Sequence, residues 1–315
     1  MIHPILIIGS VNMDLVMQVA HCPAGGETAL GTQYGYVPGG KGGNTAVAAA
    51  RLGLPVAFTG CVGQDDNGTA LRTALERDGV NTTHLRTVPQ PTGLAAIVVE
   101  GNGQNRIIVY AGANHSITAV QLETVFQQPW SAVMMQLEIP PAIVLEANRM
   151  AEAAGIPVVL DAGPVRAGMD VTQQCGAIWI LSPNETETLA LTGIQVTGAE
   201  SAERAACALL QTHNARHVVL KLGGMGAYHY HAALGAGQLV PGFAVTPVDT
   251  TAAGDAFTAA LTVSALERQP ETMADWQACV RFANAVGALA VTVAGAQPSL
   301  PVRAVVEAFV RERAT

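Results

Sequence analysis

Short apolar runs rich in β-branched residues alternate with Ala- and Leu-rich stretches along most of this chain, and that alternation restricts its fold most. Several of the runs are apolar throughout, as parallel strands are when helices cover both faces of their sheet. The predicted strands are PILIIGSV, VAFTGCVG, AVMMQLE, PVVLDAG, AIWILSP and HVVLKLG, and the predicted helices cover residues 44–52, 67–78, 141–154, 184–191, 202–213, 255–268 and 273–293. Repeated strand–helix units predict an α/β fold with a doubly wound, mostly parallel sheet and helices on both faces.

Two stretches do not follow this pattern. Residues 14–38 and 93–111 alternate between apolar and polar and carry Gly or Asn-Gly turn signals. The second stretch is typical of a β-hairpin around EGNGQN. We expect residues 1–315 to form a single α/β domain, with a β-sheet lid made by about 14–38 and 93–111.

Composition and charge exclude several classes of function. The net charge is −8 and the sequence has no Lys/Arg cluster, which argues against a nucleic-acid or membrane-surface partner. Its five cysteines are scattered and form no CxxC pair, which favours free thiols in a reducing compartment. The first residues have no basic region of a signal peptide, and no uninterrupted apolar segment has the length of a membrane span. We therefore expect a cytoplasmic protein.

The stretch GGKGGN, residues 39–44, places four glycines around Lys41. Such a backbone can approach a polar ligand closely, and Asn44 is expected to cap the following helix. The stretch matches neither the P-loop pattern nor the dinucleotide-binding fingerprint. An ordinary glycine-rich turn stays the alternative.

The stretch SPNETE, residues 182–187, follows a predicted strand and opens a helix. Asn184 and Glu187 have the spacing of a capping box. The same two side chains at the carboxyl end of a strand are suited to organising Mg²⁺, water and phosphate. A third glycine-rich stretch, KLGGMGA at residues 221–227, is either a flexible turn or a surface for a nucleotide.

The stretch DTTAAGDAF, residues 249–257, has small residues between two carboxylates. Ala252, Ala253 and Gly254 offer successive backbone N–H groups at a helix start, which is an anion site. Asp255 in that first turn is either an acid that the helix dipole favours or a general base beside the anion site. The segment YHYH, residues 228–231, places His229 and His231 on one strand face, but no third metal ligand is near in the sequence.

Taken together, these stretches resemble the ribokinase (PfkB) family of carbohydrate kinases, and within it most of all the ribokinases. The resemblance runs through nearly the whole chain in order and spacing. It is carried by GSVNMD, PAGGET, GGKGGN, AGAN, MQLE, SPNETE, LGGMG, VDTTAAGDAF and VAGAQPSLP. It implies transfer of the γ-phosphate of ATP to the 5-hydroxyl of D-ribose and a homodimer that packs lid against lid.

The resemblance also implies roles for individual residues. Asp255 matches the general base, and residues 252–254 match the anion hole. The sugar would be bound by Asn12, Asp14, Gly40, Lys41, Asn44 and Glu138. ATP and Mg²⁺ would be bound by Asn184, Glu187, Lys221, Leu222, Gly223, Gly224, Gly226, Gly254 and Asn284. A monovalent cation, K⁺, would be held by Asp249, Thr251, Ala290, Val293, Gly295 and Ser299.

Some residues depart from the family pattern without removing a catalytic group. They include Lys221, where a small polar residue is common, and Asn284, where histidine is common; Pro38, Gly43 and the YAGANHS segment also differ. A related kinase for deoxyribose, another small sugar or a nucleoside is therefore the alternative. A non-catalytic sugar or nucleotide sensor on the same fold is a second alternative. Such a sensor is expected to lack the general base or the anion hole, and the intact AAGD segment argues against it.

Overall fold

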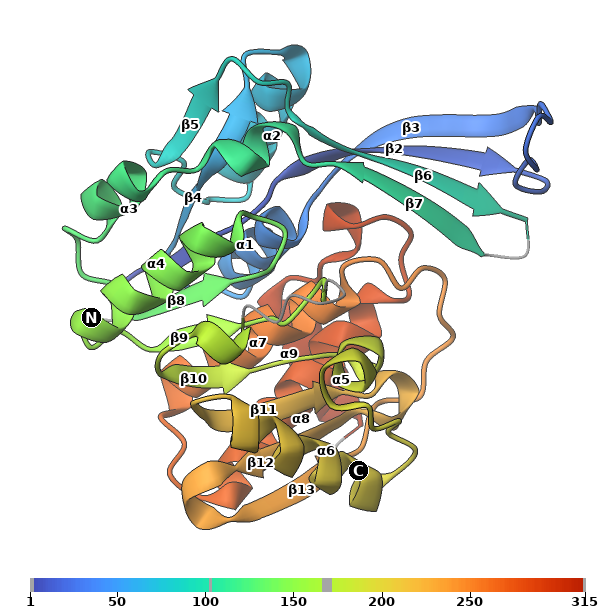
Figure 1. Cartoon of the computed structure of the whole chain (residues 1–315). Helices are drawn as coiled ribbons and strands as arrows, with labels where there is room; N and C mark the ends of the chain where they lie inside the picture. The colour runs from blue at the N-terminus through green and yellow to red at the C-terminus, as the bar shows by residue number, and fades with distance from the viewer. Residues whose placement is uncertain (1–2, 102–103, 166–171, 314–315) are drawn as a thin grey trace.

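The computed structural model describes residues 3–101, 104–165 and 172–313, and within them the largest element is a nine-stranded sheet (Figure 1). From β11 to β5 the strands run parallel, and β12 and β13 extend the sheet antiparallel at one edge. The predicted mostly parallel sheet is confirmed. In spatial order the strands are β13 (Ala236–Val240), β12 (Ala227–His231), β11 (Ala215–Lys221), β10 (Ile178–Leu181), β9 (Val158–Leu160), β8 (Ala132–Met135), β1 (Ile5–Ile8), β4 (Val56–Gly63) and β5 (Leu85–Val88).

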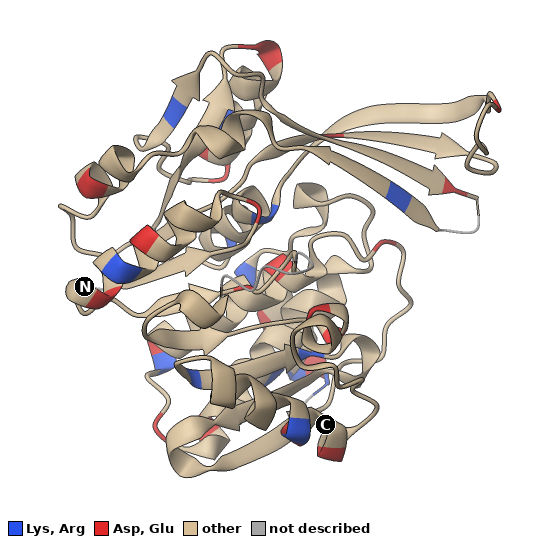
Figure 2. Ribbon diagram, in the orientation of Figure 1, with Lys and Arg blue, Asp and Glu red and all other residues tan. Residues whose placement is uncertain are grey.

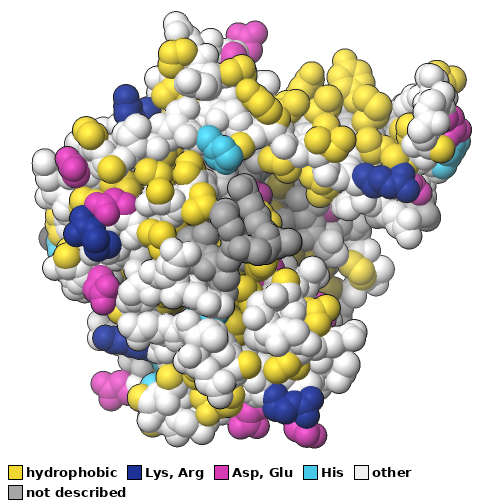
Figure 3. Space-filling view, in the orientation of Figure 1, with side chains coloured by type: hydrophobic (Ala, Val, Ile, Leu, Met, Phe, Trp, Pro, Cys, Tyr) yellow, Lys and Arg dark blue, Asp and Glu magenta, His cyan; other side chains and the backbone are white. Residues whose placement is uncertain are grey.

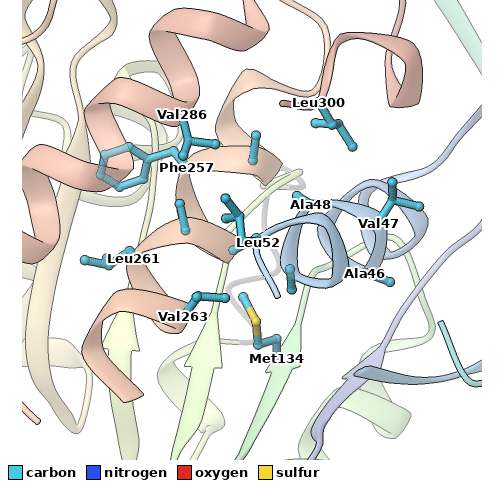
Figure 4. Close-up of a cluster of buried hydrophobic side chains, with 14 of the residues drawn as sticks. Ala46, Val47, Ala48, Leu52, Met134, Phe257, Leu261, Val263, Val286 and Leu300 are labelled. Atoms are coloured by element: carbon cyan, nitrogen blue, oxygen red, sulfur yellow. The ribbon is translucent and has the colours of Figure 1, made fainter. Parts of the chain in front are cut away.

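Helices cover both faces of this sheet. Successive strand residues point to opposite sides, and since several of the strands are apolar throughout, both faces carry apolar side chains that must be buried. In β1, Ile5 and Ile7 join one buried cluster, while Leu6 and Ile8 join the other. The first cluster, part of which Figure 4 shows, packs against α1 (Lys41–Arg51), α2 (Asp66–Arg77), α7 (Ala253–Arg268), α8 (Met273–Ala290) and α9 (Arg303–Glu312). The second packs against α3 (Ala119–Val125), α4 (Pro141–Ala153), α5 (Glu185–Thr192) and α6 (Ala199–Thr212). Each fully buried Leu or Ile stabilises the fold by about 1.5–3 kcal/mol.

A small separate sheet projects from the main body (Figure 1). Its strand order is β3 (Gly31–Gly39), β2 (Asn12–Val19), β6 (Gly93–Glu100) and β7 (Asn105–Tyr110). The β2–β3 and β6–β7 pairs are antiparallel and the β2–β6 pair is parallel. The predicted second sheet is confirmed, although the tip of its 93–111 hairpin, residues 102–103, lies outside the described residues.

Four helix boundaries differ from the predictions by two residues or more. The helix α6 starts at Ala199, three residues earlier than predicted, and α7 starts at Ala253, two residues earlier; the start of α1 and the end of α8 also differ. The helix α1 starts at Lys41, with Gly40 as its N-cap, so the prediction that Asn44 caps it is wrong. Asn44 lies in the first turn, and its side chain is directed to α7 instead of to its own backbone. The helix α8 ends at Ala290, three residues earlier than predicted.

Several short elements are not indicated by the sequence pattern. They are β5, β13, α3 and α9. The strands β5 and β13 and the helix α3 have seven residues or fewer, which is too short to show a clear period. The ten residues of α9 do carry a helical period, which the prediction did not include. None of the described helices combines the length and the apolar character that a membrane crossing requires.

Candidate active site

The carboxylate of Asp255, in the first turn of α7, is reached by two side chains from the first turn of α1. The amide of Asn44 donates to Asp255 Oδ2 over 2.9 Å, and the ammonium of Lys41 donates to Oδ1 over 3.3 Å. Asp255 is only 5% exposed. Burial raises the pKa of Asp255, and the nearby Lys41 charge opposes that rise. The structure thus brings three of the predicted site residues together around one buried carboxylate.

Lys41 is surrounded by acidic side chains. Burial disfavours its charge, but the carboxylates, Asp255 foremost and then Asp161, outweigh burial and raise the pKa of Lys41 well above its usual value. Lys41 is therefore an ammonium at any physiological pH. Its backbone N–H donates to Glu138 Oε2 over 3.2 Å.

The residues predicted to bind a sugar converge beside this centre. Asn114, from the AGAN segment, donates to Asn12 Oδ1 over 2.7 Å and accepts from the backbone of Val11 over 2.9 Å, which holds the Asn12 amide in place. Glu138 also accepts from Ser10 Oγ over 2.5 Å. Asp14 is buried, and that burial, with the negative charges of Glu138 and Asp255, raises the pKa of Asp14 to about 7.

Two glycines allow this close approach of backbone to side chain. Gly40 has a φ of 83°, and a Cβ placed on it would lie 2.7 Å from the backbone nitrogen of Asn12. A Cβ on Gly39 would overlap the carboxylate of Asp14. The glycine-rich stretch is therefore required by the site, and not only by a turn.

A cleft of about 610 Å³ lies between the small sheet and the loops that flank α7 and α8. Asp14, Val16 and Tyr34 line it from the small sheet, and Asp249, Thr251 and Gly295 line it from the main body. Concave sites of this size with a few polar groups are typical of small-molecule binding.

The capping-box interpretation of SPNETE is confirmed. The backbone N–H of Glu187 donates to Asn184 Oδ1 and the backbone N–H of Asn184 donates to Glu187 Oε2, each over 2.8 Å. Oε1 of Glu187 faces the backbone of Gly163, on the side of Lys41. This arrangement fixes both side chains at the carboxyl end of β10 and leaves one carboxylate oxygen directed toward the site.

Residues 221–226 form a tight turn at the end of β11. Gly223 and Gly226 have φ values of 51° and 97°, which side chains disfavour. Leu222 is buried in the core, and Lys221 turns inward as well, so their side chains do not project from the turn. Asn284, on α8, donates its amide to the carbonyls of Val240 and Pro241 over 3.0 and 3.1 Å.

The start of α7 has an unusual backbone. Ala252, its N-cap, has a φ of 62°, a left-handed conformation that is uncommon for a residue with a Cβ. The N–H of Ala253 makes only a long 3.4 Å bond to the carbonyl of Thr250. Such conformations gather at functional sites, where the surrounding fold maintains them.

Asp249 joins the two segments, around residues 249–251 and 290–299, to which the family resemblance assigns a monovalent cation. Its Oδ1 accepts from the N–H and hydroxyl of Thr251, and its Oδ2 accepts from the N–H of Gly295 over 2.8 Å. Burial would raise the pKa of Asp249, but the Thr251 and Gly295 bonds outweigh it and lower the pKa, so the group is an anion. Ser299 donates to the carbonyl of Ala296. Ala290 ends α8, and the side chain of Val293 is exposed.

Sequence reasoning missed Asp161, which follows β9. Its carboxylate is 2% exposed, forms an ion pair with Lys221 and lies 3.7 Å from Lys41 Nζ. A signal was present, because an acid directly after an apolar strand of a parallel sheet lies at the edge where ligands bind. Figure 2 shows Lys and Arg scattered over the ribbon. Asp161 has two of these cations, Lys41 and Lys221, within ion-pair distance.

The histidines of YHYH have a structural environment. His217, on β11, lies 3.1 Å from His229 by ring nitrogens, and both rings pack on Trp276. Burial lowers the pKa of His229 to about 3, so the ring is neutral. The part of the chain that the structure describes holds no group of three or more His, Cys, Asp or Glu side chains able to bind a metal ion.

Comparison with known proteins identifies the family. The model of the pfkB family carbohydrate kinases matches residues 3–303. The chain belongs to the pfkB family. As a pfkB kinase it is an enzyme that transfers a phosphoryl group to a carbohydrate.

Individual relatives are similar to this chain over nearly their whole length. The chain is 37% identical to the ribokinase of Haemophilus influenzae over 301 residues, covering 94% of this chain and 95% of that protein. It is 31% identical to the deoxyribokinase of Salmonella typhi, covering 94% and 95%. Its fold is similar to that of Arabidopsis thaliana ribokinase complexed with ribose and ATP, with a TM-score of 0.87, 33% identity and 99% of each chain covered.

Proposed function

We propose that this pfkB kinase is a ribokinase, which transfers the γ-phosphate of ATP to the 5-hydroxyl of D-ribose and yields ribose 5-phosphate and ADP. The observation that carries the proposal is the buried Asp255 carboxylate, held by Lys41 and Asn44. It stands beside a group of polar side chains suited to a polyol. The similarity to ribokinases over nearly the full chain supports the same substrate.

In this proposal Asp255 is the general base. Its raised pKa makes it a better proton acceptor than a surface aspartate, and it takes the proton of the attacking sugar hydroxyl. The backbone N–H groups of Ala252, Ala253 and Gly254 form the anion hole, where the N-terminal end of α7 favours the negative charge of the transferred phosphoryl group.

The sugar is assigned to the polar residues around Asp14. Asn12, Asp14, Asn44 and Glu138, with the backbone of Gly40 and with Lys41, present donors and acceptors to several hydroxyls. A 2-deoxy sugar lacks one hydroxyl, and a buried polar group left without a partner costs about 1–3 kcal/mol. Retention of this set favours ribose, while the relationship to a deoxyribokinase keeps deoxyribose as the second candidate.

The nucleotide is assigned to the other side of the α7 start. The turn at Gly223, Gly224 and Gly226, with Lys221 and Leu222 before it, and Asn284 on α8 frame this region. We assign ATP to it because the related Arabidopsis enzyme is complexed with ATP and because the glycines keep a backbone surface accessible.

The residues present fit two metal ions. Asn184 and Glu187 offer one oxygen-rich corner with a carboxylate oxygen directed into the site, and Mg²⁺ prefers one or two carboxylates together with phosphate oxygens. Mg²⁺ bound there would neutralise phosphate charge. The anionic Asp249, with Thr251, Gly295 and the carbonyls around Ala290, Val293 and Ser299, suits a monovalent cation such as K⁺, which would order the 252–255 turn.

We also propose that the small sheet is a lid and that two copies pair through it. Figure 3 shows hydrophobic side chains gathered over the visible face of the small sheet. Large apolar side chains exposed on the small sheet or beside it are Leu30, Tyr34, Tyr36, Ile107, Ile108, Val109 and Tyr110. Strand pairing and alternation place Tyr34, Tyr36, Ile108 and Tyr110 on the same face. A continuous exposed apolar surface of this kind is typical of a protein interface.

A panel of sugars with ATP, Mg²⁺ and K⁺ tests the proposed substrate. We expect the highest kcat/KM for D-ribose, with 2-deoxyribose lower by about 5- to 150-fold, as 1–3 kcal/mol implies. An equal or higher kcat/KM for deoxyribose, fructose or a nucleoside would replace ribose by that acceptor. The matched control is ribose 5-phosphate, whose 5-hydroxyl is blocked.

A further inference from the structure

Asp161 connects the two lysines of the site, and the phosphoryl-transfer proposal assigns it no role. Its Oδ2 accepts from Lys221 Nζ and from Thr258 Oγ1, the latter over 3.1 Å. Its Oδ1 accepts from the N–H of Gly163 over 3.2 Å and lies 3.7 Å from Lys41 Nζ. Each oxygen therefore faces one lysine, and the Gly163 and Thr258 bonds fix the orientation of the carboxylate.

Lys221 is held directly against the first turn of α7. Its Nζ is 3.4 Å from Thr258 Oγ1, and a Cβ built on Gly254 would lie 3.6 Å from that Nζ. Thr258 Oγ1 is also 3.0 Å from the carbonyl of Gly254. The Lys221 ammonium thus lies behind the turn that carries the proposed anion hole, and Asp161 is the carboxylate that holds it there.

The four ionisable groups alternate in sign in the order Lys221, Asp161, Lys41 and Asp255. Lys41 lies between two carboxylates, 3.3 Å from Asp255 and 3.7 Å from Asp161. The Lys41 ammonium therefore interacts with both carboxylates, and not with Asp255 alone. Burying such charges is costly unless each is paired, so the alternation is what allows all four to be charged in one buried region.

We propose that Asp161 is a positioning residue for phosphoryl transfer: it draws Lys41 partly away from the base and anchors Lys221 behind the anion hole. The proposal rests on the proposed kinase function and deepens it. Without the Asp161 charge, Lys41 pairs with Asp255 alone, which weakens the base. Lys221 also loses its anchor, and the two ammonium groups repel each other.

The effect of the Asp161 charge on the pKa of Asp255 can be separated from the effects of the other acids around Asp255. The base is faced by Lys41 and Asn44 from α1, by Asp161 after β9, by Glu138 after β8 and by Asp14 on β2. Of the acids, Asp161 has the strongest influence on Asp255, and its negative charge raises the pKa of Asp255. Removing it alone therefore lowers the pH at which the base ionises, while Glu138 and Asp14 stay in place.

The test compares Asp161→Asn with the double variant Asp161→Asn/Lys221→Met. The double variant leaves no unpaired ammonium at 221, so it keeps the fold if the single variant unfolds. In both we expect kcat to fall by about 100-fold, within the range for a misaligned proton transfer, while KM for the sugar changes by less than about threefold. KM for ATP should stay within about threefold in the single variant only, because Lys221 borders the proposed nucleotide site. The acidic limb of the kcat–pH profile moves to lower pH.

Carboxyl NMR of the ligand-free protein gives a readout without turnover. The Asp255 signal, identified by its absence in Asp255→Asn, should titrate at lower pH in Asp161→Asn than in wild type. The wild-type protein is assayed first on the sugar panel. A different best sugar, or no turnover at all, counts against the ribokinase assignment. The NMR titration of Asp255 then still tests the role of Asp161. A folded variant with an unshifted Asp255 titration, or a double variant with wild-type kcat and pH profile, would overturn the proposal.

Discussion

Lys41 Nζ lies 3.3 Å from Asp255 Oδ1, although 214 residues separate them in the chain. Each residue stands in the first turn of its helix, α1 for Lys41 and α7 for Asp255. The packing of these two helices therefore assembles the centre of the site. The chemistry expected there depends on the ionisation of Asp255 and on the groups that hold it.

Replacing Asp255 by Asn tests the proposed base. The change keeps the size of the side chain, so we expect normal folding and ATP affinity within about threefold, but a loss of about 10³-fold or more in kcat. Steady-state kinetics and thermal unfolding measure both. Asp66→Asn, an exposed acid in the first turn of α2, is the matched control and should leave kcat unchanged. Near-normal turnover of Asp255→Asn would mean that Asp255 is not the base and only stabilises the N-terminal end of α7 through the helix dipole.

Replacing Asp14 by Asn tests how much the buried Asp14 carboxylate in the sugar site lowers the free energy of unfolding. The pKa of Asp14 is about 7 in the folded state, compared with 3.8 for an unperturbed aspartate. Between these pH values the folded protein keeps a proton that the unfolded chain releases, so stability falls as pH rises through this window. The difference of about three pKa units corresponds to at most about 4 kcal/mol.

Asp14→Asn carries no such titration. We expect its free energy of unfolding in urea to exceed that of wild type above pH 7, and the excess to disappear toward pH 4. The same variant should bind ribose more weakly, because an acceptor of the sugar is lost. An excess that is independent of pH would show that Asp14 does not titrate in this window.

The cation site predicts a dependence on the monovalent salt. We expect kcat in Na⁺ or Li⁺ to be lower than in K⁺ by roughly tenfold, a difference of about 1.4 kcal/mol in the barrier. Asp249→Asn should lower kcat in K⁺ and remove most of the difference between salts, since Asp249 is the anion that joins residues 249–251 to Gly295. Equal rates of the wild type in all three salts would contradict the site.

The exposed face of the small sheet predicts a dimer. Ile108, on β7, is 75% exposed. We expect light scattering to give the mass of a dimer for wild type and of a monomer for Ile108→Asp, with unchanged circular dichroism. Val120→Asp, at a comparably exposed valine of α3, is the control and should stay dimeric. A monomeric wild type at micromolar concentration would exclude pairing through this face.

Local patterns predict much of this protein. The six short apolar runs form strands of the main sheet, and the 14–38 and 93–111 stretches form the second sheet. Periodicity and turn residues are properties of neighbouring positions, so they can be recognised in one sequence. The capping pair of Asn184 and Glu187 is equally local and is found as predicted.

Long-range packing decides the rest. Asn44 does not cap α1, because a bond to Asp255 of another helix takes its side chain. Asp161 and Lys221 form a pair across 60 residues, and sequence spacing carries no sign of it. The pKa values of Asp14 and Asp255 likewise depend on burial and on charges brought from distant segments. The tertiary structure decides which groups are charged and which groups they pair with. Electrostatic and desolvation energies depend on distance in space and on burial, and not on separation along the chain.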